Sequence, residues 1–94
     1  MWEVLENKDV LKQLKKTPTE IKQKYEFWKN VAKVDGPKGL KLLSGLKDHA
    51  LKGDWSGARS SRLNKQWRVI YSVEKTKFNI FVLEVNTHDY RKKT

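Results

Sequence analysis

With 94 residues, the chain can form one compact domain over residues 1–94, and it is too short for a second independent core. It has no cysteine for a disulfide or a thiolate metal site, no secretory signal, and no apolar run near the roughly 20 residues that cross a bilayer, so we expect a soluble cytoplasmic protein. Its net charge of +10 favours a polyanion such as nucleic acid as the partner over an anionic membrane surface, and an acidic protein partner that coexists with nucleic acid stays open.

The N-terminal segment predicts a short strand followed by a helix. Residues 2–5 place Trp2 and Val4 on one side by period-two alternation. Asn7 is a suitable N-cap for a helix whose apolar positions begin at Val10. We therefore expect the chain to begin with a strand followed by a helix.

A second helix is predicted from the sequence Thr17-Pro18-Thr19-Glu20, with Thr17 as N-cap and Glu20 as its partner in a capping box. Gly36 followed by Pro37 ends this helix, since glycine adopts the left-handed cap conformation and proline cannot continue the ladder. Its apolar residues recur at helical spacing and predict a buried stripe: Ile21, Tyr25, Trp28 and Ala32. The two helices therefore form a hairpin.

The rest of the chain changes character twice. Between residues 36 and 57 we expect an irregular, basic connection with about one helical turn. Residues 58–63, 67–74 and 78–85 are rich in β-branched and aromatic side chains and predict an antiparallel meander. The predicted fold is α+β, in the order β-α-α-β-β-β, with the helical hairpin packed on one face of a small, twisted, mainly antiparallel sheet.

Basic residues gather on and around the predicted strands. Arg59, Arg62 and Arg68 lie in strands, and four lysines flank them in loops: Lys41, Lys47, Lys52 and Lys65. The sheet face that the helices leave uncovered is therefore a candidate surface for a phosphodiester backbone. The alternative for each arginine is protection of a sheet edge or an ion pair with Glu74 or Glu84, so the cluster is better evidence than any one member.

The two histidines are the candidate acid and base. His49 lies in the connection and His88 just after the last predicted strand, both in polar surroundings. Imidazole has an unperturbed pKa of about 6.5 and exchanges protons near neutrality. A lone surface histidine is usually inert, so a catalytic role requires that both converge on the arginine-lined face.

Other kinds of site find little support. The chain has no phosphate-cradling glycine loop, no HExxH and no GxSxG, and its aspartates are scattered in the sequence, so we expect no metal. Metal-free cleavage of RNA is the hydrolytic chemistry that these residues readily support. The 2′-hydroxyl of the substrate is the nucleophile, and the protein supplies a base, an acid and positive charge for the transition state.

Two segments resemble the RelE/ParE superfamily of bacterial toxins, and within it the messenger RNA-cleaving RelE, YoeB and YafQ branches: LKDHALKGDWSGARSSRLNKQWRVIYSVE and FNIFVLEVNTHDYRKK. The resemblance covers roughly residues 40–92. It implies a RelE-like fold and a toxin of a type II toxin–antitoxin system that needs no cofactor. It also implies cleavage of messenger RNA in the ribosomal A site, contact with 16S ribosomal RNA, and inhibition by a cognate antitoxin in a hetero-oligomer.

The resemblance assigns roles by matching position. Arg68 resembles the arginine that contacts the reacting phosphate, and Arg62 stands where relatives carry a basic residue or a histidine. His88 matches the histidine or arginine that acts as general acid. His49 matches a histidine of the YafQ branch, which suits a general base or proton relay. The residues expected to bind substrate are Arg59, Lys47, Lys52, Lys65 and Tyr90, the last by orienting the RNA or stacking on a base.

Gln66 departs from the family pattern, because some relatives carry an acidic catalytic residue there, and this leaves the identity of the base open. For Trp55 and Trp67, packing in the core is favoured over stacking on RNA. Three alternatives remain: a ParE-like inhibitor of DNA gyrase, a non-catalytic nucleic-acid-binding module, and an inactive relative kept for antitoxin binding or autoregulation. ParE toxins generally lack the basic catalytic set, so His88 with the two arginines favours a ribonuclease.

Overall fold

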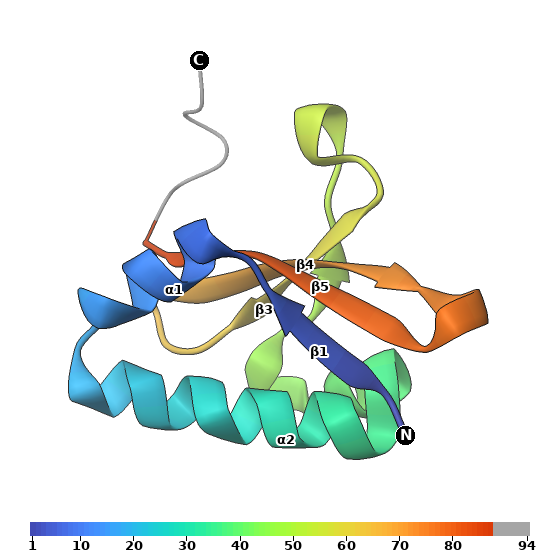
Figure 1. Ribbon diagram of the computed structural model, residues 1–94, viewed down its shortest axis with the longest axis horizontal. Helices are drawn as coiled ribbons and strands as arrows, with labels where there is room; N and C mark the ends of the chain where they lie inside the picture. Colours follow the sequence, from blue (N-terminus) through green and yellow to red (C-terminus); the bar gives the residue numbers. More distant parts are fainter. Residues whose placement is uncertain (88–94) are drawn as a thin grey trace.

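A five-stranded mixed sheet with two helices forms the computed structural model, which describes residues 1–87 (Figure 1). The elements in chain order are β1 (Glu3–Glu6), α1 (Lys8–Lys15), α2 (Thr19–Leu42), β2 (His49–Ala50), β3 (Ala58–Arg62), β4 (Arg68–Glu74) and β5 (Asn79–Asn86). Short 3-10 turns lie at Ser44–Leu46, Gly53–Trp55 and Lys75–Lys77. The strand order is β1-β5-β4-β3-β2, and β1 runs parallel to β5 while the other pairs are antiparallel.

The predicted fold class is confirmed, and all four predicted strands lie within one residue of their expected bounds. Both helices pack on a mainly antiparallel sheet, with α2 below it in Figure 1. Among residues 1–87, neither helix is long and apolar enough to span a membrane.

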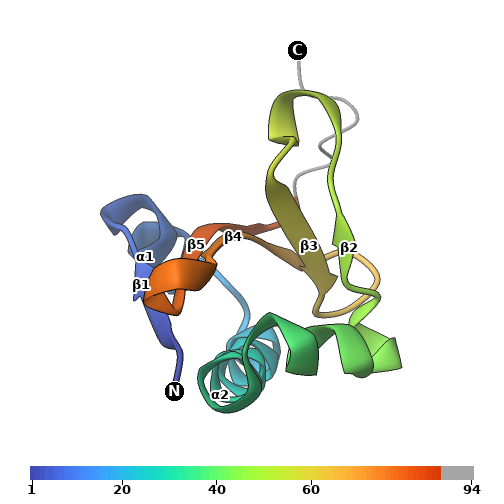
Figure 2. The ribbon, with the colours of Figure 1, turned by 90° about the vertical axis from the view of Figure 1, so that its right-hand side faces the viewer.

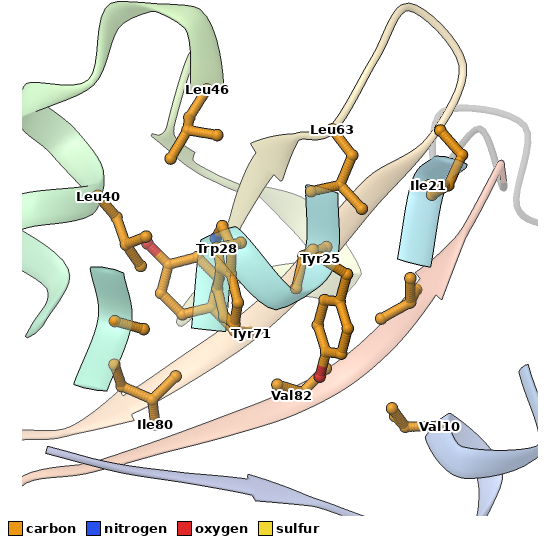
Figure 3. Packing of buried hydrophobic residues seen from close by; sticks show 13 residues of the cluster. Val10, Ile21, Tyr25, Trp28, Leu40, Leu46, Leu63, Tyr71, Ile80 and Val82 are labelled. Carbon is orange, nitrogen blue, oxygen red and sulfur yellow. The ribbon is translucent and has the colours of Figure 1, made fainter. Parts of the chain in front are cut away.

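The core lies between α2 and one face of the sheet (Figure 3). The predicted stripe of α2 is buried there, and the rings of Trp28 and of Tyr71 from β4 pack edge to face, with centroids 5.3 Å apart. The sheet contributes the side chains that alternate toward the helix: Val69, Tyr71, Ile80, Val82 and Val85. Because a strand sends successive side chains to opposite faces, the residues between these form a second surface that α2 does not cover.

Helix α1 packs along β5 and closes part of its edge. Asn7 caps the helix as predicted, accepting a hydrogen bond of 2.8 Å from the backbone N–H of Val10. β1 pairs only with residues 79–82 of β5. Beyond that point the backbone N–H of Val85 donates to Gln13 Oε1 at 2.9 Å. The side chain of Gln13 therefore accepts a hydrogen bond from β5 where β1 no longer pairs with it.

The predicted start of α2 was wrong by one residue. Pro18 is the N-cap and forms no side-chain cap, so the capping box between Thr17 and Glu20 is absent. The buried hydroxyl of Thr17 instead donates to the carbonyl of Gln13 at 2.7 Å. The connection is so short that the end of α1 supplies this acceptor before α2 begins.

The connection after Gly36 is more regular than predicted. Gly36 does interrupt the helix, with φ 69° and ψ −163°, but Pro37 begins a second helical segment that continues to Leu42. Proline suits the first position of a helix because its φ is already helical and it has no N–H to leave unpaired. β2 then pairs with β3 as a fifth strand, whose two residues are too few to show an alternating pattern. In Figure 2 the β2–β3 hairpin rises on the side of the sheet away from α2.

Candidate active site

The sheet face turned away from α2 carries a row of polar side chains across three strands. Arg68 begins β4, and the strand register places Arg62 of β3 and Asn86 of β5 directly opposite it. All three side chains are half-buried. The two arginines therefore lie side by side, and they lie on the face that the core does not use, as predicted.

The turn between β3 and β4 sets this register. Asn64 Oδ1 accepts hydrogen bonds from the backbone N–H groups of Gln66 and Trp67 at 2.8 and 2.7 Å. The backbone N–H of Leu63 donates to the carbonyl of Trp67 at 2.8 Å. A side-chain amide that bonds the backbone two or three residues on is a common way to close such a turn. Closing it here brings two like charges together at its base.

Arg62→Gln should raise the free energy of unfolding by about 0.2 to 1 kcal/mol, because like charges directly opposite in a sheet repel and glutamine keeps much of the stem. Arg62 forms no ion pair with any residue from 1 to 87 that would offset this gain. Thermal unfolding measures the change. The matched control is Arg59→Gln in the same strand, which breaks a buried ion pair and should destabilise. A loss of stability in Arg62→Gln would mean that Arg62 holds the sheet together.

His49 lies on the same face as the arginine row. It pairs with Ser60, which in turn pairs with Ile70 of β4, so its row is the one next to Arg62 and Arg68. His49 is exposed, and its Nδ1 lies 2.9 Å from the carbonyl oxygen of Lys47. A carbonyl only accepts, so Nδ1 carries the proton and Nε2 carries the lone pair of the neutral ring. This tautomer suits a base that acts through Nε2.

Arg59 does not share this face, and the prediction that placed it there was wrong. It pairs with Tyr71, whose side chain belongs to the core side, whereas Arg62 is three residues further along β3 and so points the other way. Neither Glu74 nor Glu84 is its partner. Its Nε donates to Asp48 Oδ1 at 2.7 Å in an ion pair.

Asp48 is the residue that sequence reasoning missed. Its side chain is fully buried and accepts hydrogen bonds from Arg59, Ser61 and the hydroxyl of Tyr71. Burial and the hydrogen bond to Asp48 raise the pKa of Tyr71, so this phenol remains a donor. Burial alone lowers the pKa of Arg59, but the hydrogen bond and charge of Asp48 outweigh it and the pKa rises. In the sequence, Asp48 looks like one of several scattered carboxylates, and only the pairing of β2 with β3 reveals its role.

The remaining predicted residues border the face or lie outside the described part. Lys47, Lys52 and Lys65 are exposed in the loops before β2, between β2 and β3, and between β3 and β4. His88 and Tyr90 lie outside residues 1–87.

Trp55 and Trp67 pack against apolar clusters, which is the role favoured for them from the sequence. Trp67 lies against the main core. Trp55 packs on a second apolar cluster, which also contains Ile70. Ile70 pairs with Ser60, the partner of His49, so this cluster lies on the same sheet face as His49. Gln66, at the position where some relatives are acidic, is exposed.

The face combines two kinds of chemistry. Guanidinium groups bind phosphate oxygens through a fixed fork of donors, and imidazole exchanges protons near neutrality. Within residues 1–87, no group of three or more His, Asp or Glu side chains is placed to hold a metal ion.

Comparison with known proteins gives one family and several similar folds. Residues 3–91 match the sequence profile of the family described as bacterial toxin of type II toxin–antitoxin system, YafQ. YafQ from Escherichia coli strain BL21(DE3) is 17% identical with a TM-score of 0.78, over 99% of this chain and 100% of that chain. A chain of the archaeal RelE–RelB complex from Pyrococcus horikoshii OT3 is 22% identical with a TM-score of 0.73, over 99% of this chain and 98% of that chain.

The Escherichia coli DinJ–YafQ toxin–antitoxin complex contains a third similar chain, 19% identical with a TM-score of 0.75, over 98% of each chain. At such identities the structural likeness establishes a shared fold. No curated protein sequence matches the chain.

Proposed function

Since this chain belongs to the YafQ family of bacterial toxins from type II toxin–antitoxin systems, we propose that it is an endoribonuclease that cuts messenger RNA on the ribosome. The observation that carries this proposal is the pair Arg62 and Arg68, set side by side on an uncovered sheet face with His49 in the adjacent row. Repelling charges held together by a closed turn favour an anionic ligand such as the phosphate of RNA.

The proposed reaction uses the substrate's own hydroxyl. Nε2 of His49 takes or relays the proton of the 2′-hydroxyl, and the resulting oxygen attacks phosphorus. Arg62 and Arg68 stabilise the charge of the pentacoordinate transition state. His88 donates a proton to the leaving 5′-oxygen, so the products are a 2′,3′-cyclic phosphate and a 5′-hydroxyl.

Binding of the RNA strand follows from the loops around this face. Lys47, Lys52 and Lys65 neutralise phosphates, and Tyr90 orients or stacks on a base. Arg59 is left out of this set, because its Nε is committed to Asp48 on the other side of β3.

The family of this protein and its net charge indicate which partners it binds. The similar chains include YafQ in complex with DinJ and RelE in complex with RelB, and this toxin pairs in the same way with a cognate antitoxin in a hetero-oligomer. A net charge of +10 suits both 16S ribosomal RNA around the A site and an acidic antitoxin segment. Its place of action is the cytoplasm, where ribosomes are.

The decisive experiment incubates the purified protein with messenger RNA, with and without programmed ribosomes, and maps new 5′ ends by primer extension. We expect cleavage at discrete codons that requires ribosomes and is lost in Arg68→Ala. Lys33→Ala, which removes one charge from the exposed surface of α2, is the matched control and should cut normally. Without a product, salt-dependent RNA binding would indicate a non-catalytic module, and inhibition of DNA supercoiling would indicate a gyrase inhibitor.

A further inference from the structure

The buried carboxylate of Asp48 joins three segments of the chain. None of its side chain is exposed to solvent, and the donors that reach it come from β3 and β4. Arg59 Nε and Ser61 Oγ lie 2.7 and 2.6 Å from its two oxygens, and the hydroxyl of Tyr71 binds the same oxygen as Ser61. A buried charge is tolerated only when it is paired and hydrogen-bonded, so this network fixes the carboxylate firmly.

The strand that follows Asp48 is short. β2 consists of two exposed residues at the edge of the sheet, paired only with Ser60 and Arg59. The residue before Asp48, Lys47, has a left-handed backbone with φ 45°. The Asp48 network therefore anchors this segment on its N-terminal side, while Leu51 anchors the other side, since it is buried and donates its backbone N–H to the carbonyl of Ala58 at 2.9 Å.

Asp48 and His49 lie on opposite faces of the sheet. Asp48 bonds to Arg59, Ser61 and Tyr71 on the core side. His49 pairs with Ser60 and lies on the side of the arginine row. One peptide unit of about 3.8 Å separates their Cα atoms, so a shift of the carboxylate moves the imidazole directly. The preceding peptide unit, between Lys47 and Asp48, carries the carbonyl oxygen that contacts His49 Nδ1.

We propose that Asp48 is a positioning residue, whose buried network with Arg59, Ser61 and Tyr71 holds His49 beside the arginine row. The part of this proposal that concerns cleavage rests on the proposed function. Asp48 itself touches no RNA, because the sheet lies between its carboxylate and the arginine row.

A matched pair of tyrosines tests this role. Tyr71 and Tyr25 are both buried, and each donates its hydroxyl to a carboxylate, Tyr71 to Asp48 and Tyr25 to Glu6. Tyr71→Phe should lower kcat for cleavage by about tenfold with little change in KM, since small misplacements of a catalytic group cost one to two orders of magnitude. Tyr25→Phe loses an equivalent bond between α2 and β1 and should stay within about twofold of wild type.

A second readout does not depend on RNA. The nitrogen chemical shifts of the His49 ring report which nitrogen carries the proton, and His88→Ala assigns the two histidines of the chain. Tyr71→Phe should change these shifts and Tyr25→Phe should leave them in place. If Tyr71→Phe does not fold, Ser61→Ala removes another donor to the same oxygen of Asp48 and replaces it in both experiments.

The outcomes separate the two proposals. A wild type that cuts no RNA, together with His49 shifts that change in Tyr71→Phe alone, would support positioning and overturn the ribonuclease function. A wild type that cuts RNA, with both tyrosine variants alike in kcat and in the His49 shifts, would overturn positioning and leave the ribonuclease function standing.

Discussion

His88→Ala should lower the rate of messenger RNA cleavage by about 10² to 10⁴-fold, the usual effect of removing a general acid or base. The departing 5′-oxygen is a poor leaving group unless a proton reaches it, and His88 is the residue we assign to that step. We expect the fold to remain, because the main core is formed by residues between Val10 and Val85. Single-turnover cleavage on programmed ribosomes measures the rate, and thermal unfolding checks the fold.

The control for this variant is its neighbour. Thr87 is exposed, and Thr87→Ala changes the same stretch of chain without removing an ionisable group, so it should cut at nearly the wild-type rate. The pH dependence gives a further test. A protonated acid is lost as pH rises, so the fall in wild-type rate on the alkaline side should disappear in His88→Ala. Unchanged cleavage or unchanged toxicity in His88→Ala would remove this residue from the mechanism.

The sequence predicted those parts of the fold that depend on long, regular patterns. The stripe of α2 repeats over several turns, and it is buried from Ile21 to Ala32 as expected. Arg68 lies on the sheet face that the helices leave uncovered, as expected, while Tyr71 of the same strand lies on the core side. The resemblance to the RelE/ParE superfamily is confirmed, since most of the chain matches the YafQ family.

What the sequence could not predict depends on pairing between segments. Arg59 and Arg62 look equivalent in a run of basic residues, yet their odd spacing sends them to opposite faces once β3 is a strand. Asp48 acquires its role only because β2, a strand of two residues, pairs with β3 and brings its carboxylate to Arg59. Neither local propensity nor hydrophobic periodicity carries this information.

Gly36→Ala should lower the free energy of unfolding by about 2 to 5 kcal/mol, combining backbone strain with overpacking. Gly36 has φ 69° and ψ −163°, a conformation essentially restricted to glycine. A Cβ there would lie 2.3 Å from Nε1 of Trp2 and 2.6 Å from its Cε2. Movement of the indole would disturb its edge-to-face contact with the ring of Phe78, whose centroid is 5.2 Å away, while the backbone N–H of Trp2 is held by the carbonyl of Lys33 at 3.0 Å.

Gly45→Ala is the matched control, since nothing lies within 4 Å of a Cβ at that position and its φ is not positive. It should be neutral or slightly stabilising, by up to about 1 kcal/mol. Urea unfolding of both variants measures the difference, and equal stabilities would mean that the ring of Trp2 repacks without cost. The effect extends to the candidate site, because the bend at Gly36 directs the second segment of α2 toward β2 (Figure 2). A partly folded Gly36→Ala protein should therefore lose cleavage together with its stability, whereas His88→Ala loses cleavage alone.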